Sequence, residues 1–203
     1  FARSGVDALT VTGHKIGGPV GVGALLVRRD TPVTPIMFGG GQERSIRSGT
    51  LDKAGIIGLA VAVQDAVAHR VERAVAHAAL RDELIRAVTA QVPDVLLSGD
   101  PGAGLMDGGP SRLPGNAHLR FPGCEGDSLL MLLDAAGIEC STGSACTAGV
   151  ARPSHVLLAM GLPEPDARAS LRFTFGHTST IDDVTAVAQA IGPAVQRSRR
   201  AAL

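Results

Sequence analysis

The sequence predicts an α/β fold, and three features of its hydrophobic pattern lead to that prediction. Two short extended apolar runs, 8–11 and 21–27, flank a glycine-rich turn near the start of the chain. Apolar residues then recur at helical spacing from about Lys53 to Gln91. Later, two alternating segments, 116–121 and 171–176, lie on either side of an amphipathic stretch. The chain has 203 residues, enough for one or two domains with hydrophobic cores.

The first half of the chain is predicted to begin with a strand, a turn and a second strand over residues 6–28. Pro32 and Pro35 then interrupt the pattern. The helical spacing over 53–91 predicts a long connecting helix that a kink could divide, and the domain boundary is expected within it. Residues 1–52 would then belong to one domain and residues 92–203 to another.

The second domain is predicted to start with a short strand that ends at Leu97. The segment 98–114 is rich in glycine, proline and aspartate, which predicts a loop. A strand at 116–121 and an amphipathic helix at 125–136 follow, and Gly137 closes the helix. We further expect a short helix over 153–160, a strand over 171–176, and a last helix with Thr180 as its N-cap. On the 171–176 strand, alternate residues face one side, which leaves Arg172 on the polar side.

Composition argues against several classes of function. The formal net charge is zero, so no overall field favours nucleic acid or a membrane surface. The chain has no Trp or Tyr, which disfavours stacking on single-stranded nucleic acid. No apolar run reaches the roughly 18 residues of a membrane span, and the first residues do not resemble a signal peptide. Three cysteines without metal-type spacing indicate no disulfide framework, no metal site and a reducing compartment, so we expect a cytoplasmic protein.

The segment around Lys15 is the first candidate for chemistry. It reads Thr12-Gly13-His14-Lys15-Ile16-Gly17-Gly18-Pro19 and follows a predicted strand. A lysine held there by the backbone but left accessible has the placement that a Schiff-base lysine needs. From these residues alone, a surface lysine in a hairpin turn remains the alternative.

A second candidate is the loop 39–50, which contains three successive glycines, two arginines and a terminal Thr50. Glycines allow a backbone to approach an anion, and arginines and hydroxyls bind phosphate. An ordinary solvated loop remains the alternative.

The third candidate is Cys146, at the centre of a run of small residues over 141–149. Such a segment packs little, so the cysteine is expected to be accessible, although an inert small hydrophobic residue is the usual role of a free cysteine. Cys124 and Cys140 are interpreted as structural.

These motifs together resemble the pyridoxal-phosphate (PLP)-dependent cysteine desulfurases of iron–sulfur cluster biogenesis. The resemblance rests on the Gly-His-Lys turn, the Gly-Gly-Gly-Gln-Glu-Arg…Arg-Ser-Gly-Thr loop, Ser-Thr-Gly-Ser-Ala-Cys and Leu-Arg-Phe-Thr-Phe-Gly, in that order. It implies the fold-type I architecture of class V aminotransferases. Residues 1–52 would be the trailing part of the large PLP domain, 53–91 the connecting helix, and 92–203 a small α+β C-terminal domain.

The resemblance also implies residue roles and partners. Lys15 would bind PLP covalently and later move the substrate Cα proton, while Thr12 and His14 would hydrogen-bond its phosphate. Thr50 would reach the phosphate of the other subunit in a homodimer. Arg172 would bind the carboxylate of L-cysteine. Cys146 would take the sulfur as a persulfide and pass it to a scaffold or carrier protein.

Two departures from the family pattern limit this reading. His177 stands where many relatives have arginine, so the role of that position is open. The family also has a large portion before the Gly-His-Lys turn, with an aspartate and a histidine that contact PLP. We therefore expect these 203 residues alone to bind PLP poorly, and a longer parent to be the enzyme. A selenocysteine lyase or another PLP β-eliminating enzyme, and a non-catalytic interaction module, remain the alternatives.

Overall fold

The structure is a computed structural model that describes residues 1–101, 105–106, 109–143 and 153–201. The polypeptide divides into two compact units, Phe1–Val71 and Glu72–Leu203. The division lies within the segment that the sequence pattern assigned to the connecting helix. Each unit is described separately below.

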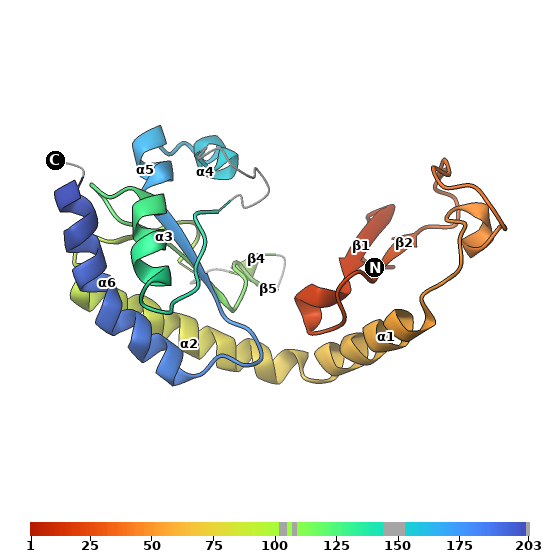
Figure 1. Ribbon diagram of the computed structural model, residues 1–203, viewed down its shortest axis with the longest axis horizontal. Coiled ribbons are helices and arrows are strands. Elements are labelled where there is room, and N and C mark those ends of the chain that lie inside the picture. Colours follow the sequence, from red (N-terminus) through yellow and green to blue (C-terminus); the bar gives the residue numbers. More distant parts are fainter. Residues whose placement is uncertain (102–104, 107–108, 144–152, 202–203) are drawn as a thin grey trace. The chain divides into compact units, whose positions relative to one another are not determined.

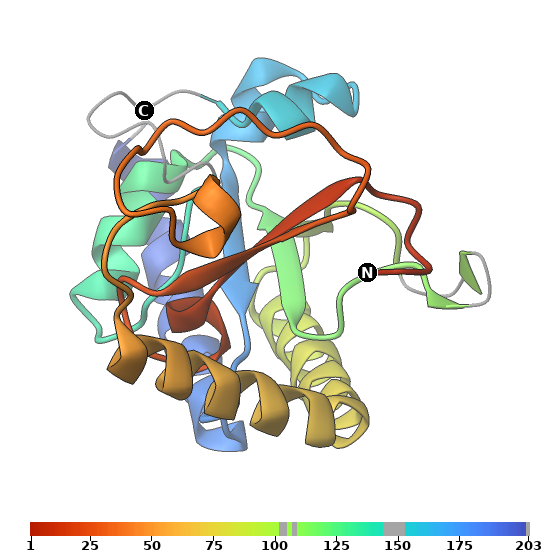
Figure 2. The same cartoon turned by 90° about the vertical axis from the view of Figure 1, so that its right-hand side faces the viewer.

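The first unit is built on a two-stranded antiparallel ribbon of β1 (Ala8–Thr12) and β2 (Gly23–Val27). One 3₁₀ turn, η1 (Gly13–Ile16), follows β1 and begins the connection to β2. Figure 2 shows the ribbon as a twisted pair of strands. The predicted strand, turn and strand over 6–28 are therefore confirmed.

Helix α1 (Lys53–Ala68) completes this unit, after a long loop that includes the short turn η2 (Glu43–Ser45). The Asp52 carboxylate caps the helix, because its Oδ1 accepts a hydrogen bond of 3.0 Å from the Gly55 backbone N–H. This cap explains why the helical pattern begins at Lys53.

The predicted long helix is two helices in the structure. Helix α1 ends at Ala68, and α2 (Arg70–Gln91) begins after the single residue His69. Among the described helices, none is alone long and apolar enough to cross a membrane, and only α1 and α2 taken together as a bent pair pass that test of length and composition.

The second unit contains a three-stranded antiparallel sheet of β3 (Leu96–Leu97), β6 (Asn116–Arg120) and β7 (Ser170–Thr174), in that spatial order. Figure 2 shows β6 in green and β7 in blue side by side. Their register places Ala117 opposite Phe173 and His118 opposite Arg172. Alternate side chains of β6 and β7 therefore point to an apolar face and to a polar face.

The apolar face of this sheet is covered by helices. The long helices α2 and α6 (Ile181–Ala201) and the shorter α3 (Gly126–Asp134) carry its packing partners, as Figure 1 shows. The largest fully buried apolar side chains in this core are Leu84, Val88, Leu119, Phe121, Leu129, Leu133, Leu171, Ile191 and Val195. Burial of this many side chains, at about 1.5–3 kcal/mol each relative to exposure, holds the second unit together.

Three short elements of this unit were not predicted. The segment expected to be a loop over 98–114 contains a hairpin of β4 (Leu105–Met106) and β5 (Gly109–Pro110). Helix α4 (His155–Ala159) was expected, but α5 (Glu164–Arg168) was not. Elements of two to five residues are too short to produce a hydrophobic period, so the sequence pattern cannot reveal them.

Candidate active site

The turn that carries Lys15 is fixed by close backbone contacts around Gly13. The Gly13 backbone N–H donates a 2.9 Å hydrogen bond to the carbonyl of Val22, and the Gly18 N–H donates one of the same length to the carbonyl of Gly13. A Cβ added at Gly13 would lie 2.8 Å from the Pro19 carbonyl oxygen, so only glycine fits. The local sequence therefore sets the position of the lysine backbone.

On this turn the polar side chains face solvent. Lys15 and His14 are exposed, and Thr12 is half-buried. The Thr12 hydroxyl lies 2.9 Å from Nδ1 of His14, within hydrogen-bonding distance. An accessible primary amine thus stands next to a hydroxyl and an imidazole. This set of groups suits a ligand that carries both an aldehyde and a phosphate, because the amine attacks the carbonyl and the two neighbours hydrogen-bond phosphate oxygens.

Helix α1 supports the turn through small residues. A Cβ added at Gly58 would lie 2.5 Å from Cγ of Pro19, and one added at Gly18 would lie 3.1 Å from Cβ of Ala62. Side chains of ordinary size at these positions would push the helix away from the turn. The small residues Gly18, Gly58 and Ala62 thus allow α1 to lie close to the Lys15 segment.

The loop that ends at Thr50 is folded back on itself. The Gly49 backbone N–H donates a 2.9 Å hydrogen bond to Oε1 of Gln42, and Met37 forms an isolated backbone bridge with Arg47. Thr50 is exposed at the end of the loop. This unit therefore contains Thr12, His14, Lys15 and Thr50, of which the first three share one turn.

Within the same loop, η2 has an unusual backbone. Glu43, Arg44 and Ser45 have φ angles of 49°, 58° and 60°, all in the left-handed region. Each non-glycine residue there costs about 1–2 kcal/mol, and a run of three is rare. Strain of this kind concentrates at ligand-binding segments, so the backbone marks this loop as a candidate site in addition to its glycines and arginines.

Arg172 lies in the second unit, on the polar face of the sheet. Its backbone forms two hydrogen bonds with Ser141, of 2.7 Å and 3.1 Å, which fix the strand next to that segment. Its Nη1 donates to the Gly143 carbonyl at 3.5 Å. Among the described residues no carboxylate lies within ion-pair distance of Arg172. Its guanidinium is therefore available to an external carboxylate.

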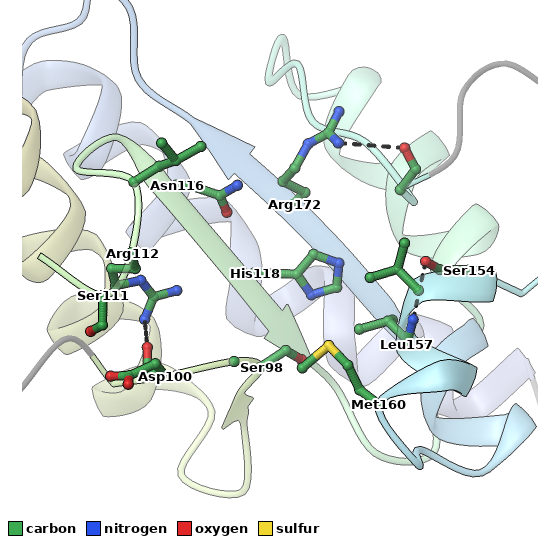
Figure 3. A pocket seen from close by; sticks show the side chains of 14 residues that line it. Ser98, Asp100, Ser111, Arg112, Asn116, His118, Ser154, Leu157, Met160 and Arg172 are labelled. Atoms are coloured by element: carbon green, nitrogen blue, oxygen red, sulfur yellow. Dashed lines mark hydrogen bonds between the residues drawn. The ribbon is translucent and has the colours of Figure 1, made fainter. Parts of the chain in front are cut away.

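A pocket of about 380 Å³ lies over this face, and Arg172 forms part of its wall (Figure 3). Its polar side chains come from β6, β7, the segment before β6, and the start of α4. They are Ser98, Asp100, Ser111, Arg112, Asn116, His118, Ser154 and Arg172. The sequence pattern identified only Arg172 of this set. The alternation on 116–121 could have identified Asn116 and His118, because it places them on the polar face of the same sheet.

His118 is the central side chain of this pocket. Burial lowers its pKa below the ordinary value of 6.5, and the positive charges of Arg172, Arg112 and Arg120 lower that pKa further. The imidazole is therefore neutral at physiological pH. It offers one hydrogen-bond donor and one acceptor to a ligand.

The structure describes two of the three cysteines, Cys124 and Cys140. Cys124 is buried and Cys140 is half-buried, and both are free thiols. Burial raises the pKa of Cys124, and burial with the nearby Asp134 carboxylate raises the pKa of Cys140 to about 11. Neither is a thiolate at neutral pH, in agreement with their structural interpretation. Cys146 lies outside the described residues.

Metal ligands do not gather anywhere in the described part of the chain. No group of three or more His, Cys, Asp or Glu side chains there could hold a metal ion.

The comparisons with known proteins agree on one family. The family described as class-V aminotransferase matches residues 1–187. An IscS-like cysteine desulfurase of Mycobacterium tuberculosis is 57% identical over 203 residues, which are 100% of this chain and 50% of that protein. The cysteine desulfurase NifS of Azotobacter vinelandii is 38% identical over 97% of this chain and 47% of its own length. The chain thus spans about half the length of the curated relatives it matches.

Solved structures agree with this result. A structure titled as a NifS-like protein superimposes with a TM-score of 0.81 at 28% identity, over 96% of this chain and 48% of the other. A NifS-like protein from Rickettsia africae gives a TM-score of 0.80 at 30% identity, over 95% and 48%. The mixed α/β fold observed here is therefore that of NifS-like proteins.

Proposed function

The chain belongs to the class V aminotransferase family, and from that premise we propose that it is part of a PLP-dependent cysteine desulfurase. The proposed reaction converts L-cysteine to L-alanine and leaves the sulfur on Cys146. The observation that carries the proposal is the Lys15 turn, where an accessible amine stands beside the Thr12–His14 pair. The relatives named above are all cysteine desulfurases or NifS-like proteins, which favours this reaction over a selenocysteine lyase.

The Lys15 turn would hold PLP, in keeping with the fold-type I PLP enzymes. Lys15 supplies the amine that binds the cofactor aldehyde, and Thr12 and His14 bind its phosphate. When bound, PLP supplies the electron sink that stabilises negative charge on the substrate carbon. The Lys15 amine would also move the Cα proton of the substrate. The glycine contacts of the turn keep the amine in position during these steps.

Arg172 would bind the substrate carboxylate. Its planar guanidinium can make two parallel hydrogen bonds to a carboxylate, and none of the described carboxylates occupies it. The pocket around it is large enough for an amino acid of the size of cysteine.

The sulfur step is assigned to Cys146 from its motif. The Cys146 thiolate attacks the sulfur of the substrate, and a new S–S bond forms as the substrate C–S bond breaks. The electron pair of that C–S bond stays with the substrate carbon, which takes up a proton to give alanine. Cysteine and an enzyme thiol thus yield alanine and an enzyme persulfide, with atoms and electrons balanced. The thiolate must be the attacking form, which the buried thiols Cys124 and Cys140 cannot supply at neutral pH.

The persulfide would then pass to an acceptor protein for iron–sulfur cluster assembly. We further propose that the enzyme is a homodimer in which Thr50 contacts the phosphate bound by the other subunit. The exposure of Thr50 and the strained loop before it support this assignment. Free thiols at Cys124 and Cys140 are compatible with a reducing compartment, and we propose a cytoplasmic location.

The chain offers a direct test, because it contains two lysines, Lys15 and Lys53. Protein that carries this sequence is incubated with PLP, reduced with borohydride, digested and analysed by mass spectrometry. We expect the pyridoxyl group on Lys15 and not on Lys53, the first residue of α1. The Lys15→Ala variant should lose the label and the conversion of cysteine to alanine. Because these 203 residues alone are expected to bind PLP poorly, the test uses a longer protein that contains them. Label on Lys53 alone, or on neither of the two lysines, in that protein would contradict the proposal.

A further inference from the structure

Four buried polar atoms without a hydrogen-bond partner gather in one pocket. Among the described residues, the buried side-chain atoms without a partner include Oγ of Ser98, Oγ of Ser111, Nε of Arg112 and Nδ1 of His118. All four residues line the pocket over the polar face of β6 and β7. Buried polar groups are normally hydrogen-bonded, so a cluster of orphaned atoms around one cavity indicates that something belongs in it.

The unpartnered atoms are mostly donors. A guanidinium Nε–H can only donate, and the two serine hydroxyls can both donate. The neutral His118 ring can donate or accept, according to its tautomer. Ser98 is only 7% exposed, so its hydroxyl has no access to bulk solvent except through the pocket. Several unpartnered donors that line one cavity call for an acceptor with several lone pairs.

Charge distinguishes an anion from water as that acceptor. The charged side chains of the pocket are Arg112, Arg172 and Asp100, which leave a net positive charge. Burial lowers the pKa of Arg112, the positive charge of Arg81 lowers it further, and the Asp100 carboxylate offsets part of this effect. Water would satisfy the donors without compensating the charge, whereas an anion does both.

The two arginines mark different parts of the pocket. The Ser98 backbone N–H donates to the His118 carbonyl at 2.8 Å, on the β3 side, while Arg172 lies opposite His118 on the β7 side. Figure 3 shows Arg112 to the left of His118 and Arg172 above it. The Arg112 guanidinium is held in place because its Nη1 donates to the Asp100 carbonyl at 2.8 Å.

We propose that Arg112, with the hydroxyls of Ser98 and Ser111 and the ring of His118, forms a binding site for a small oxyanion. The site shares its pocket with the Arg172 guanidinium, which the proposed function assigns to the substrate carboxylate. Its ligand is a carboxylate or a tetrahedral sulfur or phosphorus oxyanion, since both present the several acceptors that the donors require. The four residues of the site are none of those that the proposed function assigns to PLP or to the substrate carboxylate.

The test is an anion titration of the 203-residue chain without PLP or cysteine, followed by ¹⁵N NMR of the Arg Nε–H and His ring signals. Sodium sulfate is the first probe because its charge is constant across neutral pH, and sodium acetate is the carboxylate probe. Sodium chloride keeps the ionic strength constant, so general screening does not contribute. We expect saturable shifts at Arg112 and His118 with at least one probe, and the tighter probe identifies the class of ligand.

Variants make the result specific. Arg112→Gln should weaken binding about tenfold or more, since hydrogen bonds to charged groups are the strong ones. Arg197→Gln, an exposed arginine on α6, is the charge-matched control and should bind as the parent does. Ser98→Ala removes an unpartnered hydroxyl without disturbing an existing bond, so it should fold normally and bind several-fold more weakly.

Three outcomes would overturn the proposal. Sulfate and acetate could give no saturable shift beyond the chloride control, which would identify the pocket as water-filled. The shifts could persist in both Arg112→Gln and Ser98→Ala, which would place the anion elsewhere. They could also disappear only in Arg172→Gln, which would assign the anion to the substrate arginine. None of these outcomes bears on the Lys15 test, so the two proposals fail independently.

Discussion

His118 shows how a single side chain takes its chemistry from its neighbours. Alone it would titrate near neutrality, but burial and three nearby arginines lower its pKa. A positively charged imidazole there would be poorly solvated and repelled by Arg172, Arg112 and Arg120. The ring is therefore held neutral in the folded state.

This effect predicts a pH dependence of stability. The unfolded chain binds a proton at His118 near pH 6.5, whereas the folded chain binds it only at lower pH. The free energy of unfolding should therefore be at its full value above pH 6.5 and fall as the pH drops below it. His118→Gln should flatten this fall in urea denaturation measured from pH 7.5 to 5. The exposed His155→Gln is the control. An unchanged slope in His118→Gln would contradict the prediction.

Cys140 provides a second prediction from a single residue. Its pKa of about 11 leaves very little thiolate at pH 7. Because the thiolate is the nucleophile, iodoacetamide should alkylate Cys140 on the order of a hundredfold more slowly than free cysteine. Mass spectrometry of timed samples measures the rate. Unfolding in urea is the control and should restore the ordinary rate, and fast alkylation in the native chain would refute the burial argument.

At the level of elements, helix α3 begins at Gly126, where its backbone lies very close to another backbone segment. Gly126 lies against the backbone of the segment that leads into β7. A Cβ there would lie 2.5 Å from the Arg168 carbonyl oxygen and 3.1 Å from that of Ser170. Backbone carbonyls at the end of α5 and the start of β7 cannot move aside cheaply. The glycine thus allows α3 to lie close to the edge of the sheet.

Gly126→Ala should therefore destabilise the second unit by about 1–3 kcal/mol, the usual cost of overpacking. Urea denaturation monitored by circular dichroism measures the loss. Gly176→Ala is the matched control, because a Cβ at Gly176 meets no atom within 4 Å. Equal stability of the two variants would show that α3 can shift to accept a methyl group.

The sequence predicted those elements whose pattern is local. The strands around the Lys15 turn were predictable from short apolar runs, and β6 was predictable because residues of alternating polarity follow one another in the chain. The sequence predicted that a kink could divide the long helix, but it did not place that break at His69, since no proline or glycine stands at that residue. Helix α5, with only five residues, begins at a proline-containing turn that reads equally well as a loop.

The two candidate sites, the Lys15 turn and the pocket around Arg172, also differ in how well the sequence predicts them. Lys15, His14 and Thr12 lie within four residues, so their turn could be predicted from sequence. The pocket could not, because antiparallel pairing of β3, β6 and β7 brings Ser98, His118 and Arg172 together from distant positions. Sequence identified Arg172 by its motif but gave no register between the strands, and register decides which polar side chains face it.

At the scale of the whole molecule, the two units differ in how much core they contain. The second unit buries a continuous cluster from its sheet and helices α2, α3 and α6. In the first unit the buried hydrophobic residues are Val22, Leu59 and Ala62, while Leu9 and Leu25 on the ribbon are about half exposed. Stability is therefore concentrated in the second unit.

Hydrogen exchange of the 203-residue chain should show this difference directly. Amides of β6, β7 and α6 should exchange only through global unfolding, while those of β1 and β2 exchange through local opening. We expect at least about a hundredfold slower exchange in the first group, since local opening requires far less free energy. Mass spectrometry of peptic fragments measures both groups. Equal protection of both units would contradict the prediction.

The left-handed run Glu43–Ser45 has a consequence for the evolution of this chain. Glycine is the residue that such a backbone favours, and it lies a single base change from the codons of glutamate and arginine and from some codons of serine. Random mutation therefore offers repeated, easy relief from this strain. The three side chains that stand there instead hold the loop in a strained backbone. Glycine substitutions at these positions should therefore be tolerated by the fold.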